Sequence, residues 1–103
     1  MKMKTNFGTY DVELQVSRYR ADGSIAVSAF SPTEGPIATL TVCLADRSLD
    51  SDEAYIDTNN CPWAPDFLTE NGFGRLTGSQ RQSGFCVYPS MKFSNEIMRR
   101  CEV

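Results

Sequence analysis

Alternation of apolar and polar residues predicts a strand near the start of the chain. In residues 10–16 every second side chain is apolar, as in a strand with one buried face: Tyr10, Val12, Leu14 and Val16. The Asp22-Gly23 pair then predicts a tight hairpin turn. Residues 25–30 form a second apolar run, and the β-branched, apolar residues 37–44 are typical of a central strand. These segments together predict a three-stranded antiparallel meander.

Shorter strands are predicted in the second half of the chain. Residues 54–57 and 85–88 are predicted to form short strands, and residues 73–76 can form another between them. We expect the last of these strands to stop at Pro89, because proline donates no backbone hydrogen bond. The polar, glycine-containing residues 77–84 predict a loop between them.

Two short helices complete the prediction. Pro65 suits the first position of a helix because its fixed φ is helical, and Asn71-Gly72 is a typical helix end. Ser94 can cap a final helix over residues 95–101. We therefore expect a single α+β domain over residues 1–103, with an antiparallel sheet that starts with the meander. One short central helix and a C-terminal helix should pack on that sheet.

The same pattern predicts which side chains meet in the core. The strands and the central helix each contribute an apolar face, and these faces should join in one cluster. The predicted members are Val12, Leu14, Val16, Leu40, Val42, Phe67, Phe85 and Val87.

The composition limits the catalytic and metal-binding chemistry that the chain can carry. The chain has 103 residues and no histidine, which removes the commonest general base and zinc ligand. We expect no enzyme, no catalytic residues, no metal and no cofactor. A further alternative is an enzyme that uses a pair of carboxylates, such as those of Asp57 and Asp66. No apolar run has the length of a membrane span or a signal peptide. The sequence therefore predicts a cytoplasmic protein without membrane contact.

The four cysteines show no Cys-x-x-Cys spacing, so a zinc knuckle or redox pair is not expected. Cys43 and Cys86 lie in apolar strand-like runs and should behave as small buried side chains. Cys61 precedes Pro62 at a position where a thiol can be exposed, but no histidine would activate it. Whether the thiols are free or paired stays open.

Acidic residues gather in one segment of a chain whose net charge is −3. A solvated connection between strands is the first interpretation. The alternative is an acidic surface that attracts a basic protein or imitates nucleic acid. Tyr55 and Trp63 would be its exposed aromatic anchors, although Trp63 also suits the core. The predicted partner-binding residues are Asp46, Asp50, Asp52, Glu53, Asp57, Tyr55 and Trp63.

A second surface is the basic hairpin end, Arg18-Tyr19-Arg20, which would suit an acidic partner. The acidic balance and the lack of a long basic run argue against direct nucleic-acid binding. At the Asp57 corner, Asn59 and Asn60 are predicted to have a structural role, because asparagine side chains bond nearby backbone in tight turns.

Three stretches carry a resemblance to a known family. They are Asp57-Thr58-Asn59-Asn60, Phe67-Leu68-Thr69-Glu70-Asn71-Gly72 and Ser83-Gly84-Phe85-Cys86-Val87-Tyr88-Pro89. Across about residues 8–93 the chain resembles small uncharacterised proteins encoded on plasmids, conjugative elements and prophages of gut bacteria. The resemblance supplies no catalytic residues. It implies an association with anti-defence genes, antirestriction and anti-CRISPR among them.

The resemblance therefore implies a non-enzymatic inhibitor made by a mobile genetic element. Above all we expect an anti-CRISPR protein that binds a CRISPR effector complex and blocks its engagement with DNA. The alternative is an accessory protein of plasmids or conjugative elements that acts by protein–protein binding. Either function requires a protein partner. The sequence does not determine the oligomeric state.

Overall fold

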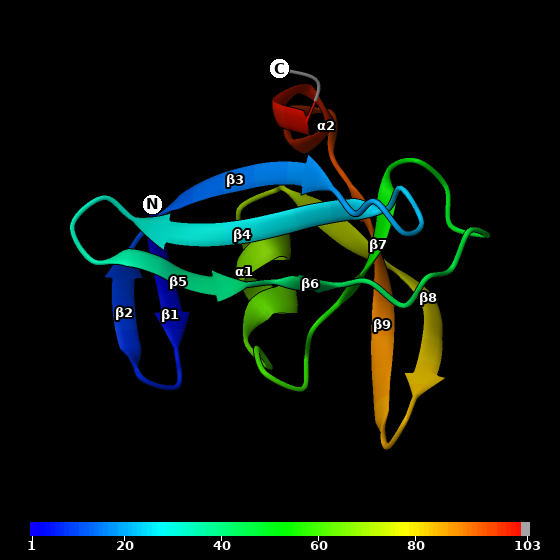
Figure 1. Ribbon diagram of the computed structural model, residues 1–103. Coiled ribbons are helices and arrows are strands. Elements are labelled where there is room, and N and C mark those ends of the chain that lie inside the picture. Colours follow the sequence, from blue (N-terminus) through cyan, green and yellow to red (C-terminus); the bar gives the residue numbers. More distant parts are fainter. Residues whose placement is uncertain (102–103) are drawn as a thin grey trace.

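A computed structural model describes residues 1–101 of the chain, and over these residues it forms nine strands and two helices (Figure 1). The predicted α+β class is confirmed. In chain order the elements are β1 (Lys2–Thr5), β2 (Gly8–Asp11), β3 (Glu13–Arg18), β4 (Ile25–Ser31), β5 (Gly35–Thr39), β6 (Thr41–Val42), β7 (Glu53–Ile56), α1 (Ala64–Glu70), β8 (Gly74–Ser83), β9 (Cys86–Phe93) and α2 (Asn95–Cys101).

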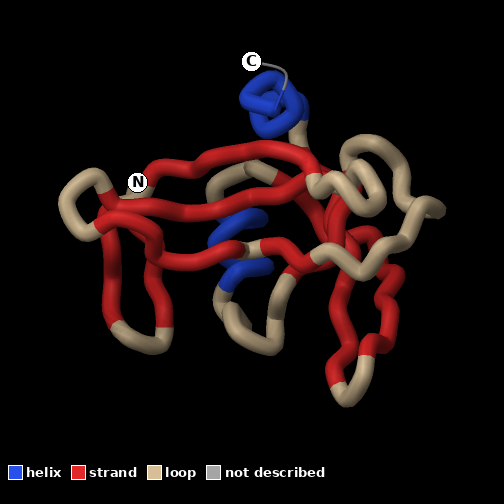
Figure 2. Tube along the Cα trace, in the orientation of Figure 1, coloured by secondary structure: helices blue, strands red, loops and turns tan. Residues whose placement is uncertain are grey.

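The strands pair antiparallel in three groups within the described residues (Figure 2). β1 and β2 form a hairpin, β3-β4-β5 form the predicted meander, and the third sheet has the order β6-β7-β9-β8. The meander is thus confirmed. It starts at Glu13, because the predicted strand over residues 10–16 divides between β2 and β3 at Val12. Its alternation holds across this break: Val12 and Leu14 are buried, while their neighbours Glu13 and Gln15 are exposed.

The predicted strand over residues 37–44 is wrong as a single element, because the chain changes sheets at Leu40. The Leu40 N–H donates to the Val27 carbonyl at 2.8 Å, on the meander side. The Leu40 carbonyl accepts from the Asp57 N–H at 2.9 Å, on the side of β6 and β7. The Leu40 side chain is completely buried. Leu40 therefore joins the two larger sheets at the core.

The predicted loop over residues 77–84 is also wrong, since β8 continues to Ser83 and β9 continues through Pro89 to Phe93. The register shifts between Leu76 and Gln80, and Pro89 lies opposite Gln80 at the end of this irregularity. A bulge of this kind tolerates a residue that lacks an N–H. The far part of the hairpin is polar because solvent reaches both of its faces, so the pattern resembles that of a loop.

One buried cluster joins the meander, β7, β9 and both helices. Of the predicted core residues, Val12, Leu14, Leu40 and Phe67 belong to it, and Val16 packs against it. Val42 is only half-buried. The prediction is wrong for Phe85, which is fully exposed, and for Val87, which is 46% exposed, because both lie beyond the core on the β8–β9 hairpin. Core members that were not predicted include Met3, Ile25, Val27, Ile56, Leu68, Met91, Phe93 and Ile97.

The helices lie close to their predicted positions. α1 begins at Ala64 and places Pro65 in its first turn, where the missing N–H costs no helical bond. It ends before Asn71 and Gly72, and Gly72 has the positive φ of 72° expected after a helix. α2 packs on β3. The predicted Ser94 cap is not formed: its hydroxyl is buried without a hydrogen bond among the described residues.

Of the two described helices, neither is long and apolar enough to cross a membrane.

Candidate interaction surface

The acidic connection before β7 is held against the end of the β3–β4 hairpin. One guanidinium nitrogen of Arg18, Nη1, donates to the carbonyls of Ser51 and Gly23, each at 2.8 Å. Arg47 Nη2 in turn donates to the Ala21 carbonyl at 3.1 Å. The acidic connection and the basic hairpin end, two alternative contact surfaces in the sequence, therefore lie side by side. Tyr19 is half-buried there, with its hydroxyl bonded to Thr41, whereas Arg20 is exposed.

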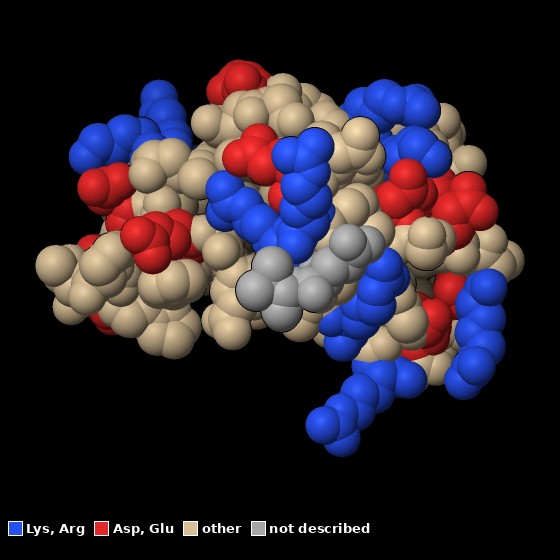
Figure 3. Space-filling model, turned by 90° about the horizontal axis from the view of Figure 1, so that it is seen from above, with Lys and Arg blue, Asp and Glu red and all other residues tan. Residues whose placement is uncertain are grey.

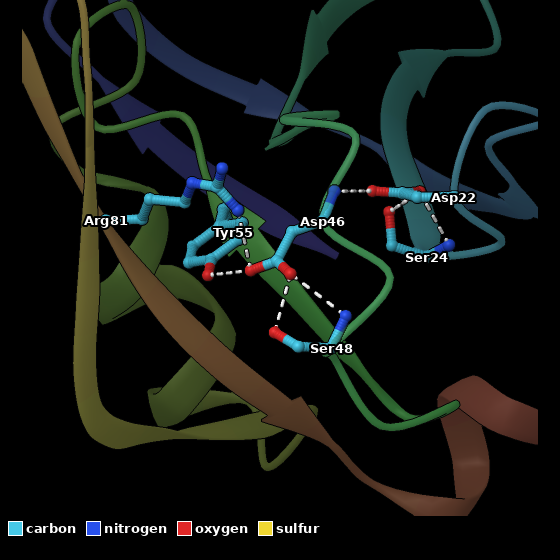
Figure 4. A network of polar contacts seen from close by, with 6 residues as sticks. All are labelled: Asp22, Ser24, Asp46, Ser48, Tyr55 and Arg81. Atoms are coloured by element: carbon cyan, nitrogen blue, oxygen red, sulfur yellow. Dashed lines mark hydrogen bonds and ion pairs between the residues drawn. The ribbon is translucent and has the colours of Figure 1, made fainter.

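Asp46 is the centre of a polar network within this surface (Figure 4). Its Oδ1 accepts hydrogen bonds from the Ser48 hydroxyl at 2.5 Å and the Ser48 N–H at 2.9 Å. Its Oδ2 accepts from the Tyr55 hydroxyl at 2.7 Å and pairs with Arg81 Nη1 at 3.0 Å. The Asp46 side chain is only 12% exposed. The Ser48 hydroxyl, and then the Tyr55 hydroxyl, hold the pKa of Asp46 well below its usual range.

The network extends from Asp46 to the hairpin turn through Asp22. The Asp46 N–H donates to Asp22 Oδ2 at 3.1 Å, and Asp22 Oδ1 accepts from the Ser24 hydroxyl and N–H at 2.6 and 2.9 Å. Burial acts to raise the pKa of Asp22, but the bonds from Ser24 and from the Asp46 N–H outweigh it and lower the pKa. This network ties the β3–β4 turn to β7 and, through Arg81, to β8.

Tyr55 is buried, with 7% of its surface exposed, so the expectation of an exposed aromatic anchor is wrong at this position. It lies in β7, which is flanked by β6 and β9, and its hydroxyl is directed at Asp46 (Figure 4). Burial, and then the bond to Asp46, raise the pKa of Tyr55. A partner can reach little of this ring.

One of the remaining acids has a basic partner, and another accepts a backbone hydrogen bond. Asp52 pairs with Lys92 at 3.0 Å, and Glu53 accepts the Asp50 N–H at 2.9 Å through Oε1. Asp50 itself is exposed. Figure 3 shows acidic and basic side chains interspersed on the face that carries α2, rather than a continuous acidic area.

Asp57 belongs to a separate feature, the corner formed by residues 57–61. Its carboxylate accepts from the N–H of Asn60 at 3.3 Å and from the Asn60 amide Nδ2 at 2.9 Å. The Cys61 N–H closes the corner on the Asp57 carbonyl at 2.8 Å. Asn60 thus takes part in the hydrogen bonds of the corner, although its side chain bonds the Asp57 carboxylate and not the backbone. The Asn59 side chain is exposed and makes no hydrogen bond among the described residues.

Cys61 is buried, so its thiol does not have the exposure that this position allows. Its Sγ lies 3.7 Å from the Thr39 carbonyl, and burial raises its pKa. All four cysteines are free. Trp63, the other predicted aromatic anchor, packs partly against the core, and its remaining surface lines hollows beside the β1–β2 hairpin. Trp63 therefore lies partly in the core and partly at the surface, and each of the two predicted placements describes part of its side chain.

The sequence interpretation missed two exposed aromatic residues at hairpin tips. Phe7 is 86% exposed in the turn between Thr5 and Gly8, and the fully exposed Phe85 lies between Ser83 and Cys86. Gly84 has a φ of 63° at the first central position of its turn, where a type II′ turn requires glycine. The pair Gly84-Phe85, a two-residue Gly-X loop, was the signal in the sequence that could have placed Phe85 at a hairpin tip. Both hairpins project to the side opposite α2 (Figure 1).

Comparison with protein families matches residues 13–102 to a domain of unknown function (DUF4313). The chain belongs to this family. The expectation of an uncharacterised family is thereby confirmed, and the match extends from the start of β3 past the end of α2. Comparisons with curated proteins and with solved structures find no match.

Proposed function

We propose that this DUF4313 protein is a non-enzymatic inhibitor that acts by binding a protein partner through its projecting hairpins. The exposed Phe85 carries the proposal. A phenylalanine side chain contributes stability by burial, and Phe85 buries none of its surface in this fold. The type II′ turn requires Gly84 but not an aromatic residue after it. Burial against a partner would account for phenylalanine at this position.

The paired strands of the hairpin hold the backbone that carries this side chain. β8 and β9 pair as far as Ser83 and Cys86, directly beside the turn. Arg81, close to the tip on β8, is fixed by its ion pair with Asp46. An anchor held on paired strands loses little conformational entropy on binding. Aromatic side chains of this kind supply much of the binding energy in protein interfaces.

Phe7 supports the same proposal. It is the large residue at the tip of the β1–β2 hairpin, where the Thr5 hydroxyl accepts the Phe7 N–H at 3.0 Å and donates to the Gly8 carbonyl at 2.9 Å. Both tips point to the same side of the molecule, with the Asp57 corner between them in the view of Figure 1. Two separated aromatic tips suit a partner surface that has more than one recess.

The identity of the partner rests on the sequence resemblance. We propose that the protein comes from a mobile genetic element and that its partner is a CRISPR effector complex, whose engagement with DNA it blocks. The exposed Asp50 and the acidic corner residue Asp57 would face the basic surfaces that such complexes use to hold nucleic acid.

A phage-plating assay tests this function. The protein is expressed in strains that each carry a different type of CRISPR system directed against the phage, and tagged protein is used to recover effector subunits. We expect the wild type to restore plaque formation in at least one strain and to recover the effector. Phe85→Ser should lose both effects, and Gln15→Ala, an exposed change on β3, should lose neither.

Two results would contradict the proposal separately. If the wild type protects phage in no strain and recovers no effector subunit, the anti-CRISPR function is wrong. Recovery of a replication or transfer protein would then favour the plasmid accessory function. If the wild type is active and Phe85→Ser is equally active, the role of the β8–β9 hairpin is wrong.

A further inference from the structure

A hollow of about 710 Å³ lies between the β1–β2 hairpin, β5 and the Asp57 corner. Aromatic and apolar residues make up about half of its lining, and polar residues make up the rest. The residues that matter here are Phe7, Tyr10, Ile37, Asp57, Asn59 and Trp63. The corner sequence that carries the family resemblance therefore borders this hollow. The acidic connection at residues 46–53 does not line it.

Charge distinguishes this hollow from its neighbour on the other side of Trp63. The neighbouring hollow is lined by two lysines and two acids, Lys2, Lys4, Asp66 and Glu70, so its charges balance. In the hollow beside the corner, Asp57 is the single charged residue of the lining. Its net charge is therefore negative, which favours a cationic ligand.

Asp57 is available to such a ligand. Asp46 and Asp52 are paired with Arg81 and Lys92, whereas Asp57 has no ion pair among the described residues. Two hydrogen bonds from Asn60 fix its carboxylate. A carboxylate has about four acceptor positions, so further acceptor positions stay open. Asp57 is half-buried and lines the wall of the hollow.

Arginine is the cation that fits this lining best. Its planar guanidinium stacks on aromatic faces and also forms directed bonds to a carboxylate. Lysine concentrates its charge in a strongly hydrated ammonium group and stacks less well. Phe7, Tyr10 and Trp63 offer aromatic surface on the same hollow as Asp57. Asn59 adds an exposed amide that can bond the backbone of an extended segment.

We propose that this hollow binds an arginine side chain of the protein partner, with the guanidinium between the aromatic faces and the Asp57 carboxylate. The inference rests on the proposed function, since it names the chemistry of the partner surface. It adds that the partner contributes an exposed arginine, as proteins that hold nucleic acid commonly do. Phe7 would then belong both to a hairpin tip and to the wall of this site.

The test uses purified full-length protein and a blocked peptide, Gly-Ser-Arg-Ser-Gly. Its control is the same peptide with citrulline, which is nearly isosteric with arginine but neutral. Trp63 is the single tryptophan of the chain, so its fluorescence reports on the hollow directly. Titration continues to about 10 mM, which covers millimolar affinities. We expect a saturable change with the arginine peptide and at least about tenfold weaker binding of the citrulline peptide.

Asp57→Asn should weaken binding of the arginine peptide about tenfold, because asparagine removes the charge but keeps an oxygen that can accept the Asn60 N–H. Glu70→Gln is the matched control: it removes one negative charge from the neighbouring hollow and should leave the affinity unchanged. If Asp57→Asn fails to fold, the comparison of the two peptides on the wild type decides the question.

No saturable change with the arginine peptide, or equal binding of the citrulline peptide, would overturn this inference. Because the assay contains no effector complex, such a result leaves the proposed inhibitor function standing. Conversely, loss of phage protection in the Phe85→Ser variant says nothing about the hollow, so the two proposals fail separately.

Discussion

The hydroxyl of Tyr55 donates a hydrogen bond to the carboxylate of Asp46 across 2.7 Å. Both residues were predicted to contact a partner, and in the fold they contact each other. Asp46 also holds Arg81 on β8, so the bond belongs to the network that joins the acidic connection to the hairpin carrying Phe85. These two residues therefore support the hairpin that we propose as the binding element.

Removing the Tyr55 hydroxyl should destabilise the protein. Tyr55→Phe deletes the donor to an ionised acceptor, and we expect the free energy of unfolding to fall by about 1 to 2 kcal/mol. Urea denaturation measures this change. Tyr10→Phe is the control, because the Tyr10 hydroxyl makes no hydrogen bond among the described residues, and its effect should stay within about 0.5 kcal/mol. Equal stability of Tyr55→Phe and the wild type would show that the bond contributes nothing.

Asp46 should contribute to the pH dependence of stability. Its pKa is lowered in the folded protein, so its stabilisation is fully present above its unfolded value of about 3.9. The contribution is lost as the pH falls from that value toward the folded pKa, because protonation breaks the bonds that favour the charged form. Urea denaturation between about pH 2 and 6 should show a shallower acid slope for Asp46→Asn than for the wild type. Some slope remains, since the pKa values of Asp22 and Asp11 are lowered too. Superimposable slopes would contradict the assignment.

Leu40 should be among the costliest core positions. Its side chain is completely buried where the two larger sheets meet, so Leu40→Ala should destabilise the fold by about 2 to 5 kcal/mol. Val87→Ala, on the exposed part of the β8–β9 hairpin, should change stability by about 0.5 kcal/mol or less. Thermal melts of the two variants compare these positions. A Leu40→Ala melt like that of the wild type would contradict the role of Leu40 as the junction of the sheets.

Alternation and turn chemistry identified the meander, because its strands each bury one face and Asp22-Gly23 marks the hairpin. They did not show that the chain changes sheets at Leu40, since an apolar run looks the same whichever strand it pairs with. The polar part of β8 resembles a loop because both of its faces are exposed. Phe85 was assigned to the core because pattern alone cannot distinguish an apolar side chain that faces solvent from one that faces the interior.

The sequence predicted the candidate site less well than it predicted the fold. The acidic connection was visible as a charge run, but its basic neighbours, Arg81 and Lys92, come from β8 and β9, far away in the chain. Sequence spacing could not show that they pair with Asp46 and Asp52. For the same reason, the sequence presented the Arg18 hairpin end and the acidic connection as alternatives, although Arg18 bonds the Ser51 carbonyl.

The acidic connection stays a predicted contact surface, and Asp50 is its most informative acid because it is exposed. Asp50→Lys should weaken binding to the effector subunit about tenfold through repulsion from a basic surface. Arg20→Glu, an exposed single charge reversal on the neighbouring hairpin end, is the matched control and should not weaken binding. Pull-down with titrated subunit compares the two. Weaker binding in the arginine variant alone would favour the basic hairpin end and an acidic partner.

The affinity of Phe85→Ser for the partner recovered by the wild type tests the central claim most directly. Calorimetry on purified proteins compares it with Gln80→Ser, a change at an exposed polar residue of the same hairpin. We predict that Phe85→Ser weakens binding at least about 30-fold, the effect of losing an anchor worth about 2 kcal/mol. Gln80→Ser should bind like the wild type, and both variants should melt like it. Unchanged affinity of a folded Phe85→Ser protein would contradict the claim that this hairpin tip is the binding element.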